Sequence, residues 1–289
     1  MDVEKLLRDN KDIDQTAKLE MADNFEREKI SEMQKRVAEA INIIYTTNLF
    51  DQEYLTQIIL TAQGNNGKKY RFTKNNVVEV DKDDYKDDDF VQGRRRDFVE
   101  IAPREDFEIH MKKALKEKRI FEVDFFDDVI TYEEFIAHEI AHNQFDLKYF
   151  DKFGEYEEVD GKTDVANEYR KKLKDIIIPL VKEYYQYVEM EKFTFKRQQI
   201  AEIYAFLYQR EFCKRSGINN DMHNKLDIKS QEFFRDPQKM LETFNKENNH
   251  DFSIEGHVYN ESHVLSLAVA RLIEEKYPNW EDRMAIFQF

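Results

Sequence analysis

Glycine and proline are scarce in this chain, which has 7 Gly and 4 Pro among its 289 residues. Sandwiches, barrels and Gly-rich nucleotide loops need many tight turns and therefore many of these two residues. Their scarcity predicts a mainly helical protein. Charged residues make up 36% of the chain, but aromatic residues make up 13%. Because disordered chains lack such an aromatic content, we expect a folded protein.

Charge and cysteine content limit the partners and the compartment. The net charge of −15 argues against nucleic acid and against an anionic membrane as partners, since both would repel the chain. Cys213 is the single cysteine, so we expect folding in a reducing cytosol. The start lacks the layout of a secretory signal, and no apolar run approaches a membrane span. We therefore expect a cytoplasmic protein, with export without a cleaved signal or delivery into a host cell as alternatives.

The apolar pattern predicts an N-terminal helical region over 1–64 and a larger domain over 65–289, with one continuous domain as the alternative. Apolar residues that step by three and four indicate helices, and alternation between turn residues indicates strands. In chain order we expect helices at 30–44 and 51–62, a hairpin at 69–80 and a strand at 98–102. A helix at 103–118 and a strand at 120–126 should follow. From 131 onward we expect mainly helix, with a break or kink at Pro179 and helices beginning at Pro237 and His263.

One short segment, His138-Glu139-Ile140-Ala141-His142, combines two histidines and a carboxylate. The preceding Thr131-Tyr132-Glu133-Glu134 has the form of a capping box, which predicts that a helix begins there. Residues four apart share one face of a helix, so His138 and His142 can bind one metal ion. Apolar neighbours predict that this helix is buried, where unpartnered histidines would be costly. The alternative is a pair of core histidines with ordinary hydrogen-bond partners.

Glu139 directly follows the first histidine. On a helix it is turned toward the side where a metal-bound water would lie. Zinc lowers the pKa of such a water toward ~7, so a carboxylate suffices to take its proton at neutral pH. We therefore predict that Glu139 is the general base of a hydrolytic reaction.

This pattern resembles the HExxH zinc metallopeptidases, the zincins. The resemblance implies an α+β, predominantly helical fold in which a small mixed sheet and the motif helix form one half of the domain. It also implies one Zn²⁺, a peptide or protein substrate, and an edge strand for that substrate, for which 120–126 is suited. Metzincins carry Gly and then His or Asp where this chain has Phe145 and Lys148. That branch is excluded, and the gluzincin branch, in which a later helix supplies a Glu as third ligand, remains.

Two glutamates compete as the third ligand. Glu168 lies in Asn167-Glu168, as in thermolysin-like enzymes, but basic neighbours suggest a solvated face. Glu202 lies within the apolar run 200–207, where a carboxylate needs a cation or strong donors. We therefore predict Glu202, with a buried ion pair to Arg197 or Arg210 as the alternative. Its Glu-x-x-Ala context resembles gluzincin toxins and effectors of the anthrax lethal factor type.

A gluzincin also needs a donor for the oxyanion, and side chains that orient the ligand histidines. Tyr259 and His263, just before a long apolar helix, are our candidates for the donor. The alternative is that this stretch caps the helix. Asp146 and Glu261 are our candidates for orienting the histidines.

Two other classes of function compete with the peptidase. Glu139-x-x-His142 is also the pattern of di-iron helical bundles, which need a second such pair. Glu247-x-x-His250 is the only other match, and it lies among polar residues. The second alternative is a non-catalytic helical interaction protein.

Overall fold

The structure is a computed structural model of the chain. It describes residues 42–44, 46–50, 59–63, 69–73, 76–80, 98–100, 132–153, 164–217, 232–249, 251, 253–260 and 263–288.

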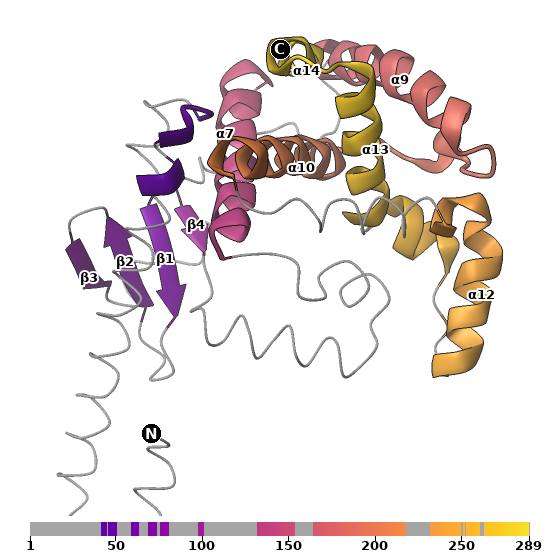
Figure 1. Cartoon of the computed structure of the whole chain (residues 1–289), viewed down its shortest axis with the longest axis horizontal. Coiled ribbons are helices and arrows are strands. Elements are labelled where there is room, and N and C mark those ends of the chain that lie inside the picture. Colours follow the sequence, from indigo (N-terminus) through magenta and orange to yellow (C-terminus); the bar gives the residue numbers. More distant parts are fainter. Residues whose placement is uncertain are drawn as a thin grey trace, which may run out of the picture.

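The longer helices that the structure describes all lie from residue 132 onward (Figure 1). The helices described are α7 (Tyr132–Phe153), α9 (Asp164–Tyr184), α10 (Arg197–Ser216), α12 (Pro237–Asn248), α13 (His263–Lys276) and α14 (Trp280–Ile286), with a 3-10 turn η1 (Met190–Lys192) and a π-helical turn η2 (Glu255–Asn260).

Helix α10 is the centre of the described core, and α7 and α13 pack against it (Figure 1). A helix with apolar residues on all sides is a buried helix. In α10 the residues Ile200, Ile203, Ala205 and Leu207 are all fully buried, although they point in different directions around the axis. The predicted apolar run of 200–207 thus becomes the central helix of the core.

Four short strands are described by their backbone: β1 (Ile59–Gln63), β2 (Lys69–Thr73), β3 (Asn76–Val80) and β4 (Phe98–Glu100). They form one sheet in the order β3-β2-β1-β4. The antiparallel pair β2–β3 lies at the predicted hairpin, and β1 runs parallel to β4. The prediction of helix over 51–62 is wrong at its end, because residues 59–62 belong to β1. Pairing with β2 and β4 fixes this segment, and such pairing is not visible in a local pattern.

The predicted fold class was α+β, predominantly helical, with a zincin-like sheet half. Its mainly helical character agrees with the structure, but the zincin-like sheet half is corrected, because no strand belongs to the described core. For the four strands the structure describes only the backbone. The described core consists of helices and the segments that join them. The three side chains of the candidate site also come from two helices, α7 and α10, and not from a strand. The predicted edge strand at 120–126 and the helix at 103–118 lie outside the described residues.

Several predicted boundaries are confirmed. Helix α12 begins at Pro237 with Asp236 as its N-cap, whose carboxylate accepts the Lys239 N–H at 3.1 Å. Helix α13 begins at His263 as predicted. The break at Pro179 is wrong, because α9 continues through it; Ile177 and Val181 on either side are fully buried and hold this turn on the core.

The part of the predicted helix at 30–44 that precedes residue 42 lies outside the described residues. Among the helices that the structure describes, none combines the length and the apolar content needed to cross a bilayer.

Candidate metal centre

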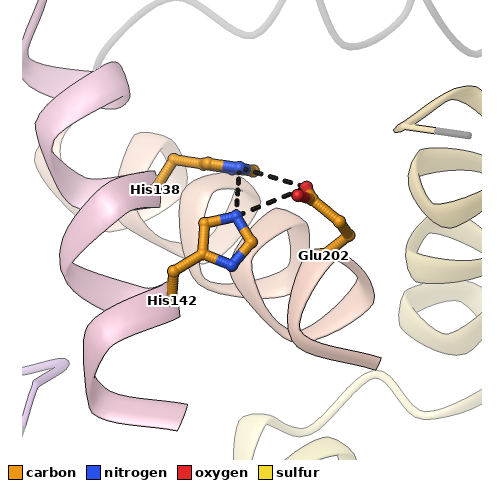
Figure 2. A group of neighbouring side chains, drawn as sticks. All are labelled: His138, His142 and Glu202. Atoms are coloured by element: carbon orange, nitrogen blue, oxygen red, sulfur yellow. Dashed lines mark hydrogen bonds and ion pairs between the residues drawn. The ribbon is translucent and has the colours of Figure 1, made fainter. Parts of the chain in front are cut away.

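Three side chains from two helices converge at one point (Figure 2). His138 and His142 come from α7, and Glu202 comes from α10. One ligand atom from each residue lies within 4.8 Å of the others. The structure thus brings together the two motif histidines and the glutamate predicted from the apolar run, 60 residues further along the chain.

The spacing of the three atoms suits a tetrahedral ion. The two Nε2 atoms lie 3.0 Å apart. Oε2 of Glu202 lies 3.5 Å from Nε2 of His138 and 3.3 Å from Nε2 of His142. Zinc bonds of about 2.1 Å place the ligand atoms of a tetrahedron about 3.4 Å apart. Two imidazole nitrogens and one carboxylate oxygen are also a donor set that zinc accepts.

Local sequence explains why the helices present these groups. Residues four apart on α7 share a face, so both imidazoles point to the same side. Glu202 lies in the second turn of α10, at whose start the Lys196 N–H donates to the Gln199 side-chain oxygen at 3.0 Å. Helix α10 ends at Ser216 and is followed by Gly217, which has a φ of 70°; glycine adopts this left-handed conformation at little cost.

The carboxylate and the histidines are coupled electrostatically. Burial alone would lower the pKa of His142, but the negative charge and hydrogen bond of Glu202, together with weaker effects of other carboxylates, raise that pKa to about 9. The charges of Glu139 and Asp146 act in the same direction. Glu202 itself is 8% exposed. In the protein without a metal, a proton on His142 therefore balances the buried carboxylate.

A second residue of α10 contacts the first histidine. Nδ1 of His138 lies 3.0 Å from Oε1 of Gln209, which is 2% exposed. The ring of Phe206 also packs edge-on against the His138 ring, with centroids 4.7 Å apart. Sequence reasoning missed Gln209. Its position seven residues after Glu202 was a signal, because this spacing puts both side chains on one face of a helix.

Asp146 and Glu261 are the carboxylates predicted to orient the histidines. Asp146 accepts a close hydrogen bond from Arg197, and both side chains are 11% exposed. Asp146 thus ties α7 to the first turn of α10. Arg210, the other cation considered for Glu202, pairs with Glu274 on α13. Glu261 lies outside the described residues.

The other predicted site residues are Glu168, Glu139, Tyr259 and His263. Glu168 is exposed on α9 and does not belong to the converging group. Glu139 is half-buried on α7, next to His138. The Tyr259 hydroxyl accepts the Glu189 N–H at 2.7 Å, and Tyr259 is 2% exposed; this contact holds the segment before η1. For His263 the structure describes the backbone, as the first residue of α13.

Of the second Glu-x-x-His pair, the structure describes the backbone of Glu247, which lies on α12. The Glu247 side chain and His250 lie outside the described residues.

Comparisons with protein-family models, with curated proteins and with solved structures each find no match.

Proposed function

We propose that this chain is a zinc-dependent metallopeptidase of the gluzincin type. The observation that carries the proposal is the convergence of His138, His142 and Glu202 within 4.8 Å. The HExxH sequence alone supports two ligands and a base. The carboxylate from a separate helix supplies a third donor at a distance that suits zinc.

The donor set also favours a catalytic over a structural metal. Structural zinc sites are usually closed by four protein ligands, whereas catalytic sites have three and leave a position open. Among the described His, Cys, Asp and Glu residues, the converging group consists of His138, His142 and Glu202. When bound, zinc supplies a Lewis acid that lowers the pKa of water and polarises a carbonyl group.

Each residue of the chain then has a distinct task. His138, His142 and Glu202 would hold the ion. Glu139 directly follows His138 on α7, is half-buried, and would accept the proton of the attacking water, then deliver it to the leaving amine of the peptide. The hydrolysis balances, since water adds across the peptide bond and yields a carboxylate and an amine. Tyr259 and His263 stay our proposed oxyanion donors, although the Tyr259 hydroxyl already accepts the Glu189 N–H.

The test is cleavage of an unbiased peptide library by the purified wild type and by Glu139→Gln. The wild type should cleave peptides, and Glu139→Gln should lower kcat at least about 100-fold, because general-base catalysis contributes about 10² to 10⁴. The zinc content should be unchanged in this variant. Glu168→Gln, at an exposed position on α9, is the matched control and should keep full activity. Full activity in Glu139→Gln would refute the assignment of the base.

A further inference from the structure

The interface between α7 and α10 carries a row of polar contacts that extends beyond the three converging residues. On α7 the polar residues recur every fourth position, and therefore lie on one face. Their partners on α10 follow the opposite sequence order. The pairs are Glu134–Cys213, His138–Gln209, His142–Glu202 and Asp146–Arg197.

In this row, Gln209 contacts the proposed metal ligand His138 on the side of its ring that is turned away from the other ligands. Its Oε1 lies 3.0 Å from Nδ1 of His138, on the opposite side of the ring from Nε2, which faces His142 and Glu202 (Figure 2). An amide oxygen only accepts hydrogen bonds, so Nδ1 must donate the proton. A neutral imidazole protonated at Nδ1 has its lone pair on Nε2.

The surroundings fix Gln209 and the ring in place. Gln209 is 2% exposed, and the Phe206 ring, three residues earlier on α10, packs against the His138 ring. The side chain of His138 is 13% exposed. A hydrogen bond in such a setting competes little with water, so it controls both the tautomer and the rotation of the ring.

We propose that Gln209 is a positioning residue of the metal centre: its amide oxygen selects the Nδ1–H tautomer of His138 and thereby directs Nε2 toward the ion. This inference rests on the proposed function, since it assigns a role at the same site. It gives α10 two tasks, because one face of this helix supplies both the third ligand and the group that orients the first ligand.

The orienting groups of ligand histidines typically contribute 10- to 100-fold to metal affinity. The test is the Kd for Zn²⁺, measured by competition with a chromophoric chelator, in the wild type, Gln209→Met and Gln209→Glu. Gln209→Met has a similar volume and no comparable acceptor, so it should weaken zinc binding 10- to 100-fold. Gln209→Glu keeps an acceptor oxygen and should restore the affinity to within about threefold of the wild type.

Gln144→Met is the matched control for burial. Gln144 is 1% exposed at the same interface, but its amide donates to the hydroxyls of Tyr204 and Tyr208 at 2.9 and 2.8 Å. Loss of this amide should lower stability, followed by thermal unfolding, and leave the zinc Kd unchanged. A purely structural role for Gln209 would make the two Met variants behave alike.

Different failures of the experiment separate the two proposals. Equal zinc affinity in the wild type and Gln209→Met, or equally weak affinity in Gln209→Met and Gln209→Glu, would overturn the inference and leave the proposed function standing. A wild type that binds no zinc would overturn the proposed function, and the inference with it.

Discussion

Glu274 on α13 lies between two arginines. Its carboxylate accepts a hydrogen bond from Arg210 and lies 3.6 Å from the Arg283 guanidinium. Burial acts to raise the pKa of Glu274, but the charges of Arg210 and Arg283 act more strongly together and hold this pKa below its usual 4.5. The ionised form is therefore stabilised by folding.

This lowered pKa predicts a pH dependence of stability. Because the folded-state pKa lies below the unfolded value, the contribution of Glu274 is fully present above pH 4.5 and is lost as the pH falls through the folded-state pKa. Glu274→Gln should lower the free energy of unfolding by about 2 kcal/mol at pH 7. In urea denaturation the gap between wild type and variant should narrow toward pH 3. A gap of the same size at both pH values would contradict this assignment.

At the scale of elements, the contact between α7 and α10 decides whether the candidate site exists. Neither helix alone carries three ligands. The Asp146–Arg197 ion pair ties them together at one end, and the Arg197 guanidinium also lies over the Phe150 ring at 5.1 Å. Loss of either partner would remove a close counterion from a nearly buried charge.

Asp146→Asn should therefore lower the free energy of unfolding by about 3 kcal/mol, since breaking a buried pair by removing one partner is strongly destabilising. The measurement is urea denaturation at pH 7. Lys182→Met is the control, because the Lys182–Glu191 pair has side chains that are 51% and 66% exposed, and its loss should change stability little. Equal effects of the two substitutions would show that burial of the Asp146 pair has no special weight.

Local patterns predicted some elements well and others poorly. The N-cap Asp236 and the following proline fix the start of α12 because both act through adjacent residues. The strand β1 escaped prediction because its pairing with β2 and with the more distant β4, rather than its own residue pattern, defines it as a strand. The continuity of α9 through Pro179 depends on packing of the flanking residues on the core, which no local rule for proline contains.

At the scale of the whole molecule, the C-terminal helix α14 is anchored by one arginine. Arg283 is 1% exposed and donates to Glu211 on α10 at 3.1 Å. Its guanidinium also donates to the Pro278 carbonyl at 3.0 Å and lies near the Trp280 ring. This residue thus joins the end of the chain to the central helix.

Arg283→Met should lower the free energy of unfolding by about 3 to 5 kcal/mol, because Glu211 would keep a buried charge with one counterion fewer. Glu281→Ala, at an exposed position on the same helix, should change it by less than about 0.5 kcal/mol. Chemical denaturation of both variants checks this expectation. A stability of Arg283→Met close to that of the wild type would contradict the anchoring role.

The candidate site was predictable from sequence where a local pattern within one helix marks each residue. His138, Glu139 and His142 follow from helical spacing, and Glu202 follows from the cost of a carboxylate in an apolar run. Gln209 and the Asp146–Arg197 pair depend on how two helices dock, which depends on tertiary packing rather than spacing. The helical character followed from the scarcity of Gly and Pro, but the zincin-like sheet half was wrong, because a family resemblance carried by five residues does not determine how the rest of the chain packs.

The central claim is that His138, His142 and Glu202 hold one zinc ion. The most direct test is the zinc content of the chain after dialysis in metal-free buffer, measured by mass spectrometry for the wild type, Glu202→Ala and Glu168→Ala. We predict about one zinc per chain in the wild type and in Glu168→Ala, and a loss of most of the zinc in Glu202→Ala, since a protein ligand is removed. A wild type without zinc, or a Glu202→Ala variant that keeps it tightly bound, would contradict the claim.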